Sequence, residues 1–133
     1  MKVTNENIKE LNENEIFVFG SNEGGKHGAG AAKLAYEKFG AVWGVGFGHC
    51  GQSFAIPSKD KYIVTMPINR IKVYVDDFLF YVLANPNLKF FVTEIGCGLA
   101  GYVPANIAPL FELGVDLHNL YLPERFWYIL NVK

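Results

Sequence analysis

The sequence predicts a layered α/β fold, with helices on both faces of a mostly parallel or mixed central sheet. Short apolar runs typical of buried strands alternate with helical patterns along the chain. Two of these runs lead directly into glycine-rich segments, and half of the residues are hydrophobic. The length of 133 residues is close to the commonest domain size, so we expect a single domain over residues 1–133.

The first strand, loop and helix are expected within residues 16–40. Ile16–Phe19 is an apolar run that ends abruptly at a glycine, as a buried strand feeding a loop does. Ala29–Phe39 is rich in helix formers, and Gly40 is well placed to end that helix. The face of the helix that is expected to be buried carries Ala32, Tyr36 and Phe39.

The rest of the chain supplies further elements. Residues 41–51 contain four glycines and predict a turn-broken strand or an irregular connection. Further strands are expected at Ser53–Ile56, Tyr62–Met66, Leu88–Ile95 and Leu117–Leu122. Helices are expected at Ile71–Ala84 and from Pro104 to about Leu113, with a helix or strand at Pro123–Leu130.

Composition excludes several classes of protein. No apolar run approaches the roughly 20 residues that a membrane span requires, and the glutamate-rich first 15 residues do not form a signal peptide. We therefore expect a cytoplasmic protein that does not enter membranes. The net charge is −1, so strong electrostatic binding to nucleic acid is not expected.

The cysteines and histidines do not predict a metal site. Cys50 and Cys97 belong to no CxxC pair, and the three histidines do not lie at zinc-ligand spacing from them. Free, partly buried thiols are expected in a reducing compartment. We expect neither a metal nor a cofactor.

The first glycine-rich segment, Gly20–Gly30 (GSNEGGKHGAG), has five glycines in eleven residues. Backbone N–H groups that converge beside a helix N-terminus bind phosphate well, and glycine lets them approach it closely. The segment is neither a Walker A loop nor a clean GxGxxG motif. A flexible turn is the alternative, but the position between a strand and a helix favours ligand binding. Within it, His27 is either a phosphate contact or an exposed loop histidine.

The second segment, Gly96–Gly101 (GCGLAG), has the same character and alone is equally consistent with a tight turn. Both segments follow predicted strands, and ligands of α/β folds bind at the carboxyl ends of strands. One site can therefore use both loops. A ligand with two phosphates, or with a phosphate and a ribose, fits such a site.

These motifs resemble those of macro domains. Phe19-Gly20-Ser21-Asn22 with Gly28-Ala29-Gly30-Ala31-Ala32 is similar to their first glycine-rich loop, and Ile95-Gly96-Cys97-Gly98-Leu99 to their diphosphate loop. The second motif is similar to the branch of terminal ADP-ribose protein glycohydrolases and DNA ADP-ribosyl glycohydrolase antitoxins. The resemblance covers most of the chain and implies a three-layer α/β/α fold that binds ADP-ribose or an ADP-ribosylated macromolecule.

The resemblance also implies roles for individual residues. The end of the first strand, Gly20, Ser21 and Asn22, would approach the distal ribose. Gly28, Ala29 and Gly30 would line the ribose and phosphates. The second loop would wrap the diphosphate through Gly96, Cys97, Gly98, Leu99, Ala100 and Gly101, with Tyr102 over a ribose or ring edge.

Lys59 is the candidate nucleophile implied by the resemblance. In this branch a lysine before the long helix attacks the anomeric carbon of ADP-ribose, and Ile56-Pro57-Ser58-Lys59 occupies the comparable place. The alternative is a solvated lysine in a polar turn beside Asp60 and Lys61. Some of these enzymes have an acidic partner where this chain has Ala100, which puts covalent catalysis in doubt; a water ordered by Asn22 could attack instead.

Three functions remain open at this point. The first is an ADP-ribosyl glycohydrolase that uses Lys59 and Asn22. The second is a binding module for ADP-ribose or a related nucleotide signal. The third is a phosphatase or nucleotide-processing protein, which the lack of a clustered acidic metal site disfavours.

Overall fold

The computed structural model describes residues 2–131. Within them the chain forms five strands, four α-helices and one 3-10 segment, η1. In chain order these are β1 Glu15–Asn22, α1 Gly30–Lys38, β2 Gly48–Cys50, β3 Ser53–Lys59, α2 Ile68–Ala84, β4 Lys89–Val92, α3 Pro104–Ile107, η1 Ala108–Gly114, β5 Leu120–Tyr121 and α4 Glu124–Leu130.

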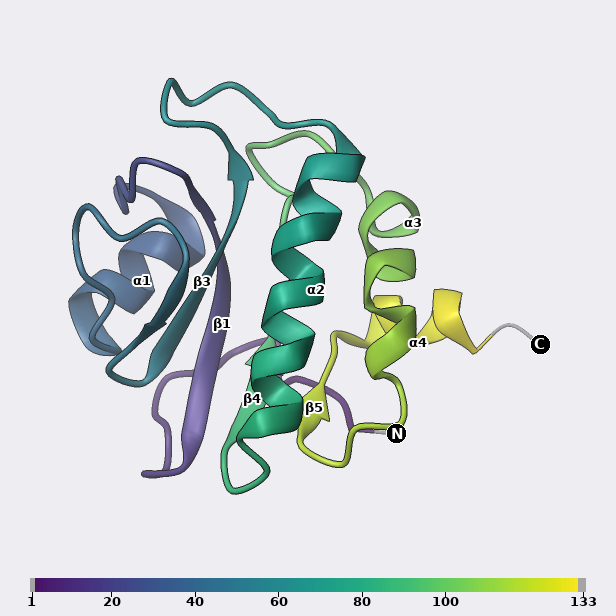
Figure 1. The fold of residues 1–133 in the computed structure, drawn as a ribbon. Coiled ribbons are helices and arrows are strands. Elements are labelled where there is room, and N and C mark those ends of the chain that lie inside the picture. The colour runs from purple at the N-terminus through teal and green to yellow at the C-terminus, as the bar shows by residue number, and fades with distance from the viewer. Residues whose placement is uncertain (1, 132–133) are drawn as a thin grey trace.

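The strands form one mixed sheet in the order β2-β3-β1-β4-β5 (Figure 1). β3, β1, β4 and β5 are parallel, and only the short edge strand β2 runs antiparallel. The prediction of an α/β fold with a mixed central sheet is therefore confirmed.

β1 is the central strand, and both of its faces are buried. Ile16 and Val18 belong to the larger hydrophobic core, whereas Phe17 and Phe19 belong to the smaller one. Because successive side chains point to opposite faces, a strand buried on both sides reads as an unbroken apolar run. This is the origin of the IFVF pattern in the sequence.

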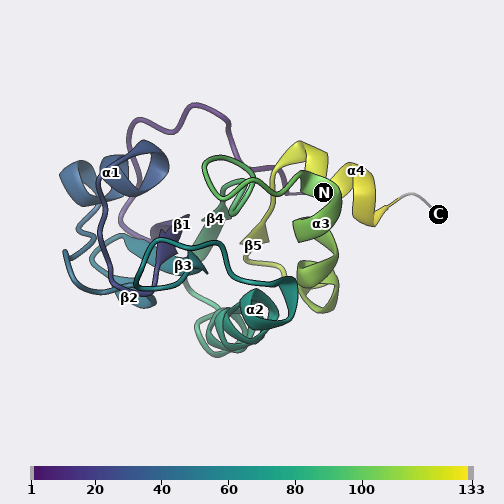
Figure 2. The same cartoon turned by 90° about the horizontal axis from the view of Figure 1, so that it is seen from above.

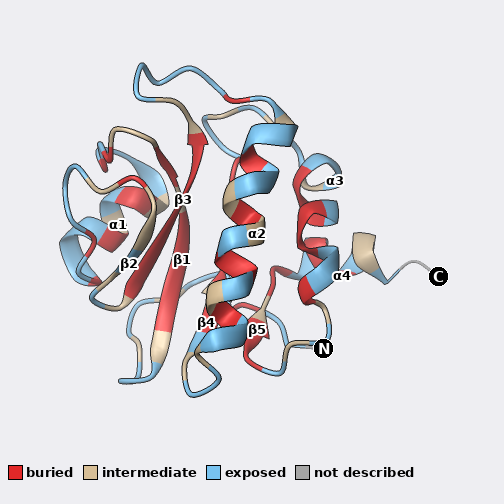
Figure 3. Ribbon diagram, in the orientation of Figure 1, coloured by how far each residue is buried: buried red, intermediate tan, exposed pale blue. Residues whose placement is uncertain are grey.

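Helices cover both faces of the sheet. α1 packs on one face and contributes Ala32 and Ala35 to the smaller core. α2, η1 and α4 supply the larger core on the other face, and Figure 2 shows α1 and α2 on opposite sides of the strands. Figure 3 shows that the buried residues follow the strands and the inward faces of these helices. No helix within residues 2–131 combines the length and hydropathy needed to cross a membrane.

The carboxyl ends of three adjacent strands meet at one edge of the sheet. β1 ends at Asn22, β3 at Lys59 and β4 at Val92, and Asn22 and Lys59 are partners in the register of β1 and β3. Both glycine-rich loops therefore leave the same edge. The connection between β3 and α2 contacts the second loop, because Thr65 Oγ1 donates to the Ala100 carbonyl oxygen at 2.9 Å.

The strand predicted at Tyr62–Met66 is wrong. β3 instead continues through Pro57 to Lys59, and Tyr62–Met66 forms a turn with a single bridge between Lys59 and Thr65. β2 pairs with β3 only as far as Ala55, so the missing N–H of Pro57 costs no hydrogen bond on that side. β3 therefore continues past Pro57, although the sequence predicts that this strand ends at Ile56.

Two helices differ in detail from the prediction. The helix expected from Pro104 to about Leu113 changes to 3-10 geometry at Ala108, since Pro109 lacks the N–H that an α-helix would use there. In α1 the buried face is formed by Ala32 and Ala35 with Phe39, while Tyr36 is exposed.

The remaining boundaries differ mainly in length. α2 has the predicted buried face and begins three residues earlier than expected, at Ile68. β4 and β5 are shorter than the apolar runs that predicted them, because turns take up residues 93–95 and 117–119. Pro123–Leu130 contains helix α4.

Candidate functional site

A cavity of about 600 Å³ opens at the carboxyl ends of β1, β3 and β4. Its lining brings together most of the residues singled out in the sequence, from both glycine-rich loops and the end of β3. These are Gly20, Ser21, Asn22, Gly28, Ala29, Gly30, Lys59, Gly96, Gly98, Leu99 and Ala100.

Three predicted ligand contacts lie outside this lining: Cys97, Gly101 and Tyr102. The Tyr102 hydroxyl donates to the Met66 carbonyl oxygen at 2.7 Å, so it anchors the loop rather than facing the cavity. Burial, together with the nearby Glu94 carboxylate, raises the pKa of the Cys97 thiol to about 11. At neutral pH Cys97 is therefore a protonated thiol and a poor nucleophile.

The Asn22 side chain closes the first loop. Its Oδ1 accepts a hydrogen bond from the Lys26 N–H at 3.0 Å, and its Nδ2 donates to the Lys26 carbonyl oxygen at 2.9 Å. An amide has two donors and an acceptor oxygen with two lone pairs. These contacts leave one N–H and one lone pair of Asn22 for a ligand.

The first loop is also packed against the segment between α1 and β2. The Ser21 hydroxyl donates to the Gly46 carbonyl oxygen. Gly25 has a φ of +68°, and a Cβ at this position would overlap the backbone of Gly44 and Val45. Gly25 is thus required by the fold itself.

His27 is neither exposed nor in contact with the cavity. It is almost fully buried, and its Nε2 lies 2.9 Å from the Val42 carbonyl oxygen and 3.1 Å from that of Val45. Both neighbours are acceptors, so Nε2 carries the proton and donates to them. Both interpretations made from the sequence are wrong, and His27 belongs to the packing that supports the loop.

Gly28 and Gly98 differ from Gly25. Neither has a positive φ, and a Cβ added to either would meet no atom within 4 Å. Both line the cavity from opposite loops. The packing of the fold therefore does not require glycine at these two positions.

The second loop offers unpaired N–H groups to the cavity. The loop is closed by its own backbone, with Gly101 N donating to Gly98 O and Tyr102 N to Gly96 O, both at 3.0 Å. The N–H groups of Gly98, Leu99 and Ala100 donate to no acceptor among residues 2–131. Consecutive free N–H groups of this kind form a site for an anion.

The N-terminus of α1 lies across the cavity from the second loop. Its N-cap residue is Ala29, whose side chain cannot accept a hydrogen bond, and the N–H groups of Gly30, Ala31 and Ala32 have no acceptor among the described residues. All four residues line the cavity. The positive end of the helix dipole therefore points at the same space as the N–H groups of the second loop.

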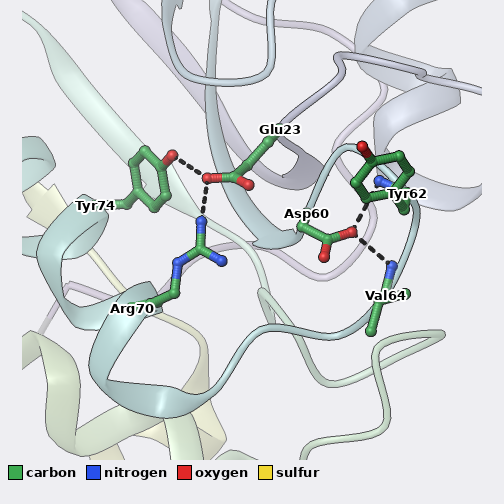
Figure 4. A network of polar contacts seen from close by, with 6 residues as sticks. All are labelled: Glu23, Asp60, Tyr62, Val64, Arg70 and Tyr74. Carbon is green, nitrogen blue, oxygen red and sulfur yellow. Dashed lines mark hydrogen bonds and ion pairs between the residues drawn. The ribbon is translucent and has the colours of Figure 1, made fainter.

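Lys59 is the half-buried cation of the cavity. Its side chain forms no hydrogen bond or ion pair with residues 2–131. The Asp60 carboxylate accepts hydrogen bonds from the N–H groups of Tyr62 and Val64 (Figure 4). Lys59 is therefore not neutralised by Asp60, and its ammonium group or amine remains available to a ligand.

Carboxylates close to the cavity are paired elsewhere. Glu23 accepts hydrogen bonds from Arg70 at 2.8 Å and from the Tyr74 hydroxyl at 2.5 Å, which raises the pKa of Tyr74 (Figure 4). Glu94 accepts two from Arg125, at 2.7 and 2.5 Å, and these lower the pKa of Glu94. Neither carboxylate is free to act as a general base.

A second cavity of about 750 Å³ adjoins the first. The two share Ala31, Thr93 and Glu94 in their linings. The second cavity has apolar side chains such as Phe17 and Leu34, and the buried Thr4 hydroxyl on its wall has no partner among residues 2–131. Its lining also carries polar and charged residues such as Asn5, Glu6 and Lys9, so both cavities combine polar and apolar groups.

Sequence reasoning missed several residues of the first cavity. They are Lys26, Trp43, Ser58, Ile63, Thr93 and Glu94. Thr93 and Glu94 directly precede the second motif, and this proximity was a usable signal. The sequence pattern predicts Ile63 within a strand, and nothing in the residues around it indicates that it lines a cavity.

Among residues 2–131, no three histidine, cysteine or acidic side chains gather in a way that could hold a metal ion. No protein-family model, curated protein or solved structure matches the chain. The likeness to macro domains therefore depends on the two glycine-rich motifs of the sequence.

Proposed function

We propose that the chain binds ADP-ribose at the carboxyl ends of β1, β3 and β4 and releases it from a modified macromolecule. The observation that carries the proposal is the pair Gly28 and Gly98. Both face open space in one cavity and neither is required by the fold. A group that approaches the backbone closely from both sides, as a diphosphate does, accounts for glycine at both positions.

The polar groups of the cavity support a diphosphate. The unpaired N–H groups of Gly98, Leu99 and Ala100 oppose those at the start of α1. Lys59 adds a positive charge without a carboxylate partner. Such charge-assisted hydrogen bonds are about twice as strong as neutral ones.

The adjoining cavity supports the adenosine part of the ligand. Its apolar residues, such as Ile8 and Leu34, can pack on a planar base, and its polar residues can form hydrogen bonds with it. The two cavities share Ala31, Thr93 and Glu94 in their linings. In this proposal the fold is a three-layer macro-like domain, and the protein acts in the cytoplasm, where the free thiols of Cys50 and Cys97 remain reduced.

Release of ADP-ribose requires only groups of this chain and water. The Lys59 amine forms a bond to the anomeric carbon as the bond from that carbon to the macromolecule breaks, and the proton that the lysine nitrogen then loses passes to the leaving group. Water then displaces the amine and frees ADP-ribose. Alternatively, a water held by the remaining hydrogen-bonding capacity of Asn22 attacks directly.

A binding module without activity is the second candidate. It is favoured by Ala100, which supplies no acidic group to accept the Lys59 proton. ADP-ribosylated protein and ADP-ribosylated DNA are the substrates to test. Under the binding-module hypothesis, wild-type protein binds ADP-ribose but releases none from either substrate.

Calorimetric titration with ADP-ribose tests the binding site. Gly98→Val should abolish binding while the melting temperature stays unchanged, because the added side chain occupies the space of the phosphate. Gly24→Ala is the matched control, since Gly24 has no positive φ, only ordinary contacts around a Cβ, and no part in the lining. Unchanged affinity in Gly98→Val excludes this placement of the diphosphate.

A release assay separates the enzyme from the binding module. Lys59→Ala should eliminate release yet change ADP-ribose affinity only a few fold, because attack stabilises the transition state and not the bound ligand. The exposed neighbour Lys61, which does not line the cavity, provides the control Lys61→Ala. A wild-type rate in Lys59→Ala assigns the attack to water beside Asn22.

A further inference from the structure

Ile63 has an unfavourable backbone conformation that the core of the protein does not explain. Its φ is +64°, and no other residue besides glycine has a positive φ within residues 2–131. A β-branched side chain at positive φ is an outlier, because its Cβ lies too close to the following carbonyl oxygen. Strain of this kind persists only where surrounding contacts enforce it, and it often marks a functional site.

Asp60 enforces this conformation. Its Oδ1 accepts hydrogen bonds from the N–H groups of Tyr62 at 2.8 Å and Val64 at 3.1 Å, which flank Ile63 on both sides (Figure 4). The backbone adds two more bonds, from Ile63 N to Asp60 O at 3.1 Å and from Asp60 N to Val64 O at 2.8 Å. The turn is therefore fixed by four hydrogen bonds to one residue.

Packing does not compensate for the strain at Ile63. The side chain is 44% exposed and belongs to neither hydrophobic core. It lies instead in the lining of the first cavity, as does Lys59 at the end of β3. The turn thus holds an aliphatic side chain against the cavity, in the segment that begins one residue after the candidate nucleophile.

We propose that Ile63 is a specificity-determining residue of this cavity, which contacts the sugar at the reacting end of the ligand. This inference rests on the proposed function. An aliphatic side chain offers a phosphate no hydrogen bond, whereas it packs well on the C–H face of a ribose ring. The N–H groups that suit the diphosphate come from the two glycine-rich loops, and Ile63 comes from the segment that follows Lys59. Ile63 therefore discriminates ADP-ribose from ADP, which lacks the second ribose.

Titration of wild type and Ile63→Gly with ADP-ribose and with ADP tests this inference. Glycine removes the side chain and adopts positive φ freely, so the melting temperature should be no lower than that of wild type. The dissociation constant for ADP-ribose should rise about ten-fold, the loss expected for one apolar contact, while that for ADP stays unchanged.

Val64→Gly is the matched control, because Val64 lies in the same turn, is exposed and does not line the cavity. It should bind both ligands as wild type does. Ile63→Asn, whose side chain tolerates the left-handed region, provides a second variant if glycine loosens the turn, and it should lose the same preference for ADP-ribose.

The outcomes separate the two proposals. If wild type binds neither ligand, the proposed function fails and the role of Ile63 fails with it. If wild type binds ADP-ribose and both Ile63 variants bind it equally well, only the role of Ile63 is overturned. An equal loss for ADP and ADP-ribose in both Ile63 variants places the contact away from the sugar and overturns the inference.

Discussion

The two glycine-rich loops that share the cavity are stabilised in different ways. The first loop is held by contacts from outside its backbone. Asn22 closes it with two hydrogen bonds, Ser21 ties it to Gly46, and Gly25 packs directly on the neighbouring segment. The second loop is closed by its own backbone hydrogen bonds and is tied at its end to the β3–α2 connection by Thr65 and Tyr102, while Leu99 at its tip is 80% exposed.

This difference indicates that the two walls of the site have different roles. The first wall is fixed before a ligand arrives, so it binds without a cost for ordering. At the second wall the tip residue Leu99 is exposed, so a ligand that accepts hydrogen bonds from Gly98, Leu99 and Ala100 can order this wall further. Substitutions at Gly25 and Asn22 in the first loop should therefore affect stability, whereas substitutions at Gly28 and Gly98 should mainly affect binding.

The largest effect is expected at Gly25. Gly25→Ala forces a side chain into the backbone of Gly44 and an L-residue into positive φ, and it should lower the free energy of unfolding by about 3 to 5 kcal/mol. Urea denaturation measures this loss. Gly98→Ala is the matched substitution in the second loop and should change stability by less than about 0.5 kcal/mol. Equal losses at both positions would remove the distinction between the loops.

The next effect concerns the reactivity of the thiol in the second loop. Because the pKa of Cys97 is raised from 9.0 to about 11, its thiolate fraction at pH 8 is about 100-fold lower in the folded protein than in the unfolded chain. In a Cys50→Ser background, alkylation at pH 8 should be slower by about this factor than in urea, and it should accelerate about ten-fold per pH unit until about pH 11. Equal rates in folded and unfolded protein would contradict the burial of this thiol.

A smaller loss of stability is expected at Asn22. Asn22→Ala removes two side-chain hydrogen bonds to the Lys26 backbone and should cost about 2 kcal/mol in urea denaturation. Asn22→Asp retains the acceptor for the Lys26 N–H but loses the donor to its carbonyl, so an intermediate loss is expected. Wild-type stability in Asn22→Ala would show that the loop is not held by this side chain.

The smallest effect is expected from the ion pair below the second loop. Arg125→Ala removes the partner of Glu94, whose carbonyl oxygen accepts the Cys97 N–H at the foot of this loop. The pKa of Glu94 is lowered from 4.5 by Arg125, so the pair contributes stability above pH 4.5 and loses it as the pH falls through the lowered value. Urea midpoints of wild type and variant should differ slightly at pH 7 and converge at low pH. A difference that stays constant with pH would show that packing, and not charge, is responsible.

Much of the fold could be predicted because local patterns agree with tertiary packing. The apolar run of β1 and the helical spacing of α2 each reflect one buried environment. The prediction was wrong where a side chain competes with regular structure. Tyr62 and Val64 favour a strand by propensity, but Asp60 captures their N–H groups and forms a turn instead.

The candidate site could be predicted only in part. Gly28 and Gly98 lie in motifs, and the parallel order of β1, β3 and β4 places these motifs at one edge. Ile63 and Trp43 reach the cavity from segments whose local sequence is ordinary. Their position depends on how four separate segments of the chain pack together, and the spacing of residues along the sequence does not predict this packing.

The central position of β1 has a consequence for biosynthesis. β1 is made first, but its neighbours in the sheet are β3, about thirty residues after it ends, and β4, more than sixty residues after it ends. Its IFVF run therefore emerges from the ribosome with both edges unpaired, in the form most prone to aggregate. Glu10, Glu13 and Glu15 directly precede this run. Because clustered charges beside an unavoidable apolar strand repel other chains, we expect these acidic residues to disfavour association through β1 while its partners are being synthesised.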